Sequence, residues 1–159
     1  MAQTPEAELL AQLRHASRLL EEILCECYSP LGIGTTRVDV LELLAGTLEC
    51  CSQSLLARQL GLSESTVCTL IDRMQVDGLL VRQRSVTDRR RSVLAVSDLG
   101  LRLLQDAASR REERLRSAFR DWTAAEQGTV FAGLQELIAT LQKSLEQAPA
   151  VPRLQERAA

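Results

Sequence analysis

Three consecutive arginines, Arg89, Arg90 and Arg91, stand in a polar segment between two short apolar stretches of the chain. Unpaired arginines are almost never buried, so a run of three indicates an exposed tip. Guanidinium groups pair with phosphates and insert into the narrow minor groove of DNA. A polyanion is therefore the expected partner of this segment. The alternative is a turn of solvated charges that touches nothing.

A second set of polar side chains belongs to a helix that the sequence predicts from Ser63 to Asp77. Its apolar positions recur at helical spacing, which leaves the other face to polar residues. The residues available to DNA are Ser63, Ser65, Thr66, Thr69 and Arg73. Ser63 is first of all the helix cap, and Thr66 shares that local role. Arg73 contacts a groove or a phosphate, or alternatively pairs with Asp72 or Asp77.

The five cysteines, at positions 25, 27, 50, 51 and 68, have neither disulfide-framework nor metal-ligand spacing. Cys25 and Cys27 are two residues apart on a predicted helix, so they point about 200° from each other. His15 is the one histidine and supplies no ligand cluster, so we expect no metal and mainly free thiols. Oxidation of Cys68, Cys25 or Cys27 is a possible redox input. The alternative for Cys68 is a small residue packed against the preceding helix.

The elements that position these residues follow from apolar periodicity, capping residues and glycine stops. Two strands on either side of the arginine tip form a hairpin. Helices are predicted over residues 5–28, 36–45, 52–60, 63–77, 98–121 and from 123 onward, with strands over 79–84 and 92–96. Helix, strand, basic loop and strand in that order are typical of a winged helix-turn-helix.

The net charge of −2 conceals an asymmetry. Residues 52–97 contain seven arginines and four acidic residues, a net charge of +3, whereas the rest of the chain carries −5. A basic module on an acidic body indicates a focused anion site. The chain contains no membrane span, no signal peptide and no glycine-rich phosphate loop, so we expect a cytoplasmic, nucleoid-associated protein that is not an enzyme and needs no cofactor.

Long amphipathic helices at both ends of the chain require a partner for their apolar stripes, most simply a second copy related by a two-fold axis. The predicted fold class is mainly α with a small β-hairpin wing: a winged helix-turn-helix DNA-binding lobe plus long dimerisation helices from both termini. The expected parts are residues 1–34 as a dimerisation helix, 35–97 as the DNA-binding lobe, 98–148 as further dimerisation helices and 149–159 as a flexible tail.

The segments LLARQLGLSESTVCTLIDRMQVDGLLVRQ (55–83) and TDRRRSVLAVSDLG (87–100) resemble the MarR family of bacterial transcriptional regulators, and the resemblance extends over nearly the whole chain. It implies a homodimer that binds double-stranded DNA at pseudo-palindromic operators, usually as a repressor. It also implies that Arg90 enters the minor groove while Asp88 holds that arginine through a charge-assisted pair. Arg89 and Arg91 would then meet phosphates or water.

The resemblance further implies an effector cleft between the dimerisation helices and the DNA-binding lobe, which His15 and Arg18 would line. Ordinary polar contacts between helices are the alternative for these two residues. Many relatives have Ser/Thr-Arg where this chain has Cys68-Thr69, so the operator sequence cannot be transferred. Peroxide-sensing relatives use a cysteine at a position occupied here by Leu10, so their mechanism is not inherited.

Three functions therefore compete. The leading hypothesis is a dimeric DNA-binding regulator that is released or modulated by a small-molecule effector or an oxidant. The alternatives are a winged-helix protein-interaction module without DNA binding and a thiol-based redox-sensing regulator. The net charge of +3 on the module favours DNA binding, and the absence of an arginine directly after Cys68 weakly favours the interaction module.

Overall fold

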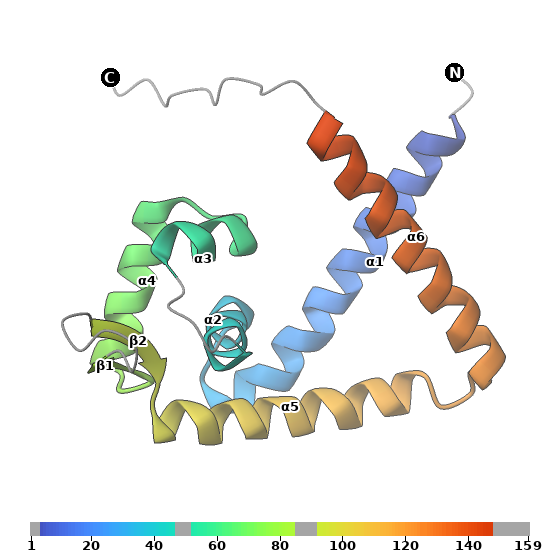
Figure 1. Ribbon diagram of the computed structural model, residues 1–159. Helices are drawn as coiled ribbons and strands as arrows, with labels where there is room; N and C mark the ends of the chain where they lie inside the picture. The colour runs from blue at the N-terminus through green and yellow to red at the C-terminus, as the bar shows by residue number, and fades with distance from the viewer. Residues whose placement is uncertain (1–3, 47–51, 85–91, 148–159) are drawn as a thin grey trace. The chain divides into compact units, whose positions relative to one another are not determined.

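The computed structural model describes residues 4–46, 52–84 and 92–147, and the chain is mainly helical there. Among these residues, no helix is long and apolar enough to cross a membrane. In chain order the elements are α1 (Pro5–Tyr28), the 3-10 helix η1 (Ser29–Leu31), α2 (Thr35–Gly46), α3 (Gln53–Leu60), α4 (Glu64–Val76), β1 (Leu80–Arg84), β2 (Ser92–Val96), α5 (Asp98–Ala118) and α6 (Ala124–Gln147) (Figure 1). The predicted fold class, mainly α with a small hairpin, is confirmed.

Side-chain caps fix where the helices begin, as the sequence predicts. Ser52 Oγ accepts a hydrogen bond from Leu55 N at 3.2 Å, and Ser97 Oγ accepts one from Gly100 N at 3.0 Å. At the start of α6, Thr123 and Glu126 form a reciprocal capping box through Thr123 N to Glu126 Oε2 (2.7 Å) and Glu126 N to Thr123 Oγ1 (3.2 Å). Each cap satisfies backbone donors that a helix leaves free at its first turn.

The chain divides into two compact units, residues 1–117 and 118–159. The core of the first unit surrounds α2, which packs on α1, α3 and β2. Val38, Val40 and Leu41 of α2 are fully buried. They meet the inward residues of the neighbouring elements, among them Tyr28, Leu56, Val67, Ile71, Met74 and Leu80. Full burial of such a side chain contributes about 1.5–3 kcal/mol, so α2 supplies much of the stability of this unit.

The hairpin is antiparallel, with Leu80 opposite Val96 and Arg82 opposite Leu94. Leu80 is 2% exposed, so its face of the hairpin lies against the core, and Val81 points to the other face and is exposed. The turn from α4 into β1 requires Gly78, whose φ of +72° is a conformation that other residues rarely adopt. A backbone bond from Ser97 N to Leu79 O at 3.0 Å fastens the end of β2 to the start of β1.

The first turn of α5 lies against the base of the hairpin at Gly100. A Cβ atom at this position would come within 2.4 Å of Leu79 O and 2.7 Å of Val96 Cγ1. The contact is possible only because glycine has no side chain. The absence of that side chain therefore fixes how closely α5 approaches the strands.

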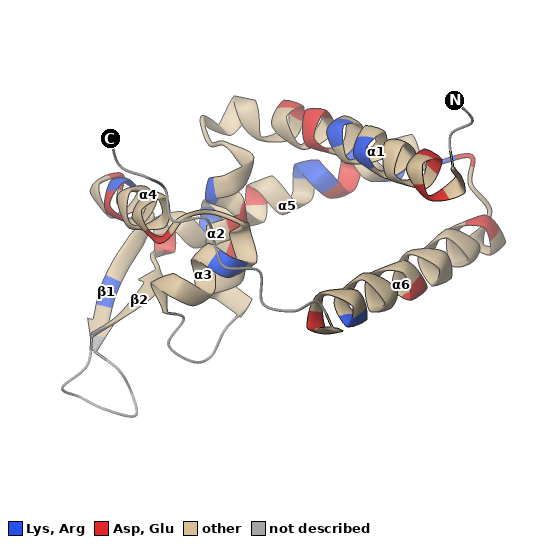
Figure 2. Ribbon diagram, turned by 90° about the horizontal axis from the view of Figure 1, so that it is seen from above, with Lys and Arg blue, Asp and Glu red and all other residues tan. Residues whose placement is uncertain are grey.

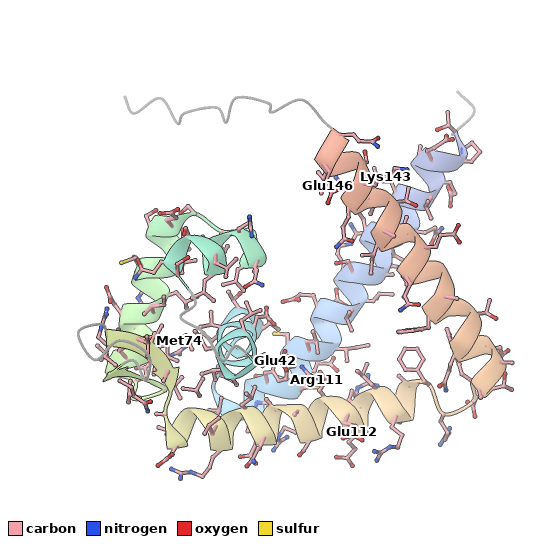
Figure 3. All side chains as sticks on the ribbon, in the orientation of Figure 1. Glu42, Met74, Arg111, Glu112, Lys143 and Glu146 are labelled. Atoms are coloured by element: carbon pink, nitrogen blue, oxygen red, sulfur yellow. The ribbon has the colours of Figure 1, made fainter. Side chains whose placement is uncertain are left out.

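A polar junction joins α5 to α1 and α2. Arg111 donates to Glu42 Oε1 at 2.6 Å and to Tyr28 Oη at 3.3 Å, and Figure 3 shows Glu42 and Arg111 facing each other. Loss of solvent raises the pKa of Tyr28, and the hydrogen bond to Glu42 raises the pKa of Arg111. Loss of solvent also raises the pKa of Asp39, which Glu42 and Glu21 raise further by repulsion.

The second unit consists mainly of α6. The fifth helix ends at Ala118, three residues earlier than predicted, and the ring of Trp122 meets that of Phe119 edge to face at 5.1 Å. Gln127 Nε2 donates a hydrogen bond to Trp122 O at 3.4 Å. No residue of α6 is buried within the single chain.

The close approach at Gly100 predicts that Gly100→Ala lowers the free energy of unfolding. Because the nearest atom is a backbone oxygen, the structure must shift, which costs about 1–3 kcal/mol. Gly46→Ala is the matched control, since no heavy atom lies within 4 Å of its added Cβ. It should leave the stability unchanged or raise it by up to about 1 kcal/mol. Denaturant unfolding at equal protein concentrations measures both, and equal effects of the two substitutions would contradict the assignment.

The raised pKa of Asp39 predicts that Asp39→Asn stabilises the protein at neutral pH. The folded chain releases this proton at a higher pH than the unfolded chain, so stability falls as pH rises from about 3.8 through the folded pKa. The gain at pH 7 should stay below about 1 kcal/mol, because Asp39 is exposed and solvent screens its charge. It should vanish at pH 3. Unfolding measured at both pH values, with exposed Glu22→Gln as control, tests this, and a loss of stability at pH 7 would refute it.

Candidate nucleic-acid interface

The pair α3–α4 forms a helix-turn-helix. Gly61 ends α3 in the left-handed conformation, with φ of +66°, and Leu62 N donates to Ala57 O at 2.9 Å. Ser63 then caps α4 by accepting from Thr66 N at 3.1 Å. A three-residue connection of this kind allows the second helix to cross the first closely enough for the two to share one core.

One face of α4 lies in that core and the other lies in solvent. Val67, Ile71 and Met74 are at most 1% exposed. Because a helix turns 100° per residue, the positions opposite these three face outward. All five residues that the sequence assigns to DNA here are exposed: the cap Ser63 and, on α4, Ser65, Thr66, Thr69 and Arg73. Cys68 and Asp72 are exposed as well. We call the set Ser65, Thr69 and Arg73 the reading face.

The hydroxyl groups at the start of α4 bond to each other. Ser63 Oγ lies 2.9 Å from Ser65 Oγ and 2.7 Å from Thr66 Oγ1, so the local roles predicted for Ser63 and Thr66 are present. Thr69 Oγ1 donates to Ser65 O at 3.1 Å. This bond uses the hydroxyl proton of Thr69 and leaves its acceptor lone pairs and its methyl group for a base edge.

Arg73 has no ion-pair partner in the part of the chain that the structure describes. Asp77, which sequence reasoning offered as its partner, pairs with Arg37 of α2 instead. Sequence reasoning missed Arg37 because 40 residues separate it from Asp77 and no local pattern connects them. The guanidinium of Arg73 therefore stays available on the exposed side of α4.

The residues of the expected wing tip, Asp88, Arg89, Arg90 and Arg91, lie outside the described residues. The strands on either side of it are described. Arg82 is exposed on β1, and Figure 2 shows basic residues without acidic ones on this strand, whereas both charges occur along α1 and α5. The basic character therefore extends from the sequence of the tip into the hairpin.

The other candidate residues do not come together. His15, Arg18 and Cys25 are exposed on α1, and Cys27 is buried near the end of that helix with its thiol 3.9 Å from Arg110 O. The alternative that packs Cys68 against α3 is wrong, because positions 67, 71 and 74 fill the inward face and leave Cys68 exposed. Across the described ranges, no three His, Cys, Asp or Glu side chains gather as metal ligands.

A cavity of about 440 Å³ lies between the end of α1 and the second half of α5. Its lining is strongly charged and comprises Glu26, Cys27, Arg110, Glu113, Arg114 and Ser117. Arg114 lies 3.8 Å from Glu26 across it. His15 and Arg18 do not line this cavity; Arg18 is eight residues, or about 12 Å of helix rise, from Glu26.

The chain is similar to known proteins in part of its sequence and in its fold. Residues 31–91 match the sequence model of the MarR family. No curated protein matches the chain in sequence. Among solved structures, a MarR family protein from Bacillus stearothermophilus aligns with a TM-score of 0.75 and 21% identity, over 89% of this chain and 99% of that one.

Two further similar structures are complexes with a ligand or with DNA. CouR from Rhodococcus jostii RHA1, bound to p-coumaroyl-CoA, has a TM-score of 0.70 and 24% identity over 86% of this chain and 95% of its own. A mutant of MepR from S. aureus, bound to an oligodeoxyribonucleotide, has a TM-score of 0.55 and 19% identity over 87% of this chain and 99% of its own. At these identities the likeness establishes the fold. Residues 31–91 thus resemble the MarR family in sequence, and the described residues share the fold of these solved structures.

Proposed function

We propose that this protein is a homodimeric, sequence-specific DNA-binding transcriptional regulator, most simply a repressor. The observation that carries the proposal is the outward reading face of α4, Ser65, Thr69 and Arg73, beside a hairpin whose loop contains three arginines. A helix with one buried and one polar face fits a major groove, and the adjacent loop reaches a minor groove or phosphates. Such a regulator acts at the nucleoid, in the cytoplasm.

The proposed contacts divide by type. Thr69, Ser65 and Arg73 would meet base edges or the backbone in the major groove, whereas Ser63 and Thr66 mainly shape the start of α4. Arg90 would enter the minor groove with Asp88 as its support, and Arg89 and Arg91 would meet phosphates. Phosphate contacts supply affinity that depends on salt, and base contacts supply specificity.

The proposed dimer rests on apolar surface that one chain leaves uncovered. On α6, Val130, Leu134, Ile138, Leu141 and Leu145 are 45–77% exposed. On α1, the exposed apolar residues are Leu9, Leu10, Leu19 and Leu20. Helices with such stripes gain most of their stability from packing, and soluble monomers rarely leave large apolar patches open. A second copy would cover both stripes through a two-fold interface.

The proposed input is a small-molecule effector, with thiol oxidation as the alternative. His15 and Arg18 on α1 would face an effector at the dimerisation helices, and the charged cavity farther along α1 is a second place for one. For the redox alternative, Cys68 is exposed on α4 next to the reading face and Cys25 is exposed on α1, whereas Cys27 is buried. Either input would act by favouring one spacing of the two reading heads.

Arg90→Ala should weaken binding to operator fragments by about 1–3 kcal/mol and make its salt dependence shallower, because one cationic contact is lost. Folding and dimerisation should not change. Titration of DNA fragments selected from the genome by the wild-type protein, at two salt concentrations, measures this. Exposed Arg116→Ala on α5 is the matched control and should bind like wild type. Unchanged binding by Arg90→Ala would remove the wing from the proposal.

The apolar stripes predict a dimer at micromolar concentration, whose unfolding midpoint rises with protein concentration. Leu141→Asp would place a charge in the proposed interface and should shift the sedimenting species toward the monomer, whereas Lys143→Asp is the control on the polar side of α6. The two reading helices of the dimer should lie about 34 Å apart, one turn of DNA. A stable, folded wild-type monomer in sedimentation would rule out both the dimer and a palindromic operator.

A further inference from the structure

The end of α4 is held to the start of α2 by an ion pair. Arg37, in the first turn of α2, donates through Nη2 to Asp77 Oδ2. The Arg37 side chain is 25% exposed and that of Asp77 50%. Asp77 caps the C-terminus of α4, where its backbone N–H bonds to Arg73 O at 2.9 Å. The pair therefore joins α2 to the residue at which the reading helix stops.

The charges at this junction explain why an arginine is needed. A helix carries partial negative charge at its C-terminus, so a carboxylate there is repelled. The guanidinium of Arg37 offsets both the carboxylate of Asp77 and the end of the helix dipole. Gly78 follows in the left-handed conformation and Leu79 N bonds back to Met74 O at 2.9 Å. The ion pair thus holds the short turn of residues 77–79, which is the whole connection between α4 and β1.

A hydrogen bond to α1 holds the first turn of α2, which carries Arg37. Thr35, two residues earlier in the same turn of α2, donates its hydroxyl proton to Glu21 Oε1 of α1. Two buried polar atoms at the junction, Arg37 Nε and Gln75 Oε1, have no hydrogen-bond partner among the described residues. Buried polar atoms without partners are unfavourable, so the contacts that Arg37 does make must offset this cost.

We propose that Arg37 is a positioning residue for DNA recognition. It touches no base in this role. Through Asp77 it sets the angle of α4 and the start of β1, so that the reading face and the hairpin fit the operator together. This inference rests on the proposed DNA-binding function and adds to it a residue outside the helix-turn-helix and the wing.

The test compares operator affinity in Arg37→Met, Asp77→Asn, the double variant and the reversed pair Arg37→Asp with Asp77→Arg. Each single variant should lose about 5-fold to 20-fold in affinity, the double variant should lose no more than the weaker-binding single, and the reversed pair should recover most of the loss. Binding to non-specific DNA at low salt should stay within about 2-fold of wild type for all variants, because the phosphate contacts remain. Exposed Arg102→Met is the control for loss of one positive charge.

The two single substitutions change the net charge in opposite directions, which separates positioning from direct attraction. If Arg37→Met weakens binding and Asp77→Asn strengthens it, Arg37 is a phosphate contact and the inference is wrong. Additive losses, or wild-type affinity in both singles, would overturn it as well. Asp77→Asn, which neutralises a half-exposed group, keeps the comparison decisive if Arg37→Met does not fold. If wild type itself selects no DNA, the proposed function fails too, and that outcome differs from a wild type that binds while its variants match it.

Discussion

The burial of α2 is the constraint on which the rest of the first compact unit depends. Val38, Val40 and Leu41 are sealed from solvent, so every neighbouring element must present an apolar side to this helix. Because Val67 and Ile71 of α4 point into the core, the opposite side of that helix must face solvent. The exposure of the reading face is thus a consequence of core packing and requires no further interaction. The same core takes in Leu80 and so fixes which side of the hairpin faces outward.

Much of this architecture follows from local sequence rules. Helices begin at capping residues whose side chains satisfy nearby backbone donors: Ser52, Ser63, Ser97 and Thr123. Such short-range interactions can be recognised from the sequence alone. The exposure of Ser65 and Thr69 follows from helical period. The burial of the wing strands on one side follows from alternation. These features were predictable because each depends on residues within one or two turns.

The features that could not be predicted depend on distance in the chain. Arg37 and Asp77 form a pair across 40 residues, and the bond from Arg111 to Glu42 spans 69. Nothing local indicates which of several charged residues will meet after packing. The same limit applies to the charged cavity beside α5, which exists only when two helices distant in sequence lie together. The exposure of Cys68, by contrast, follows from the helical period of α4, because Val67, Ile71 and Met74 take the inward positions.

The close contact at Gly100 has a consequence for how the hairpin could be altered. Because α5 touches the backbone of Leu79 and the side chain of Val96 without an intervening side chain, the stem of the hairpin is joined to that helix at its base. The register from Leu80 opposite Val96 to Arg84 opposite Ser92 is set from this end. We therefore expect a change of length or sequence between residues 84 and 92 to leave the packing of the strands on α5 unaltered. In the proposed regulator, DNA preference could therefore change through residues 85–91 alone, while the two strands and their contact with α5 stay the same.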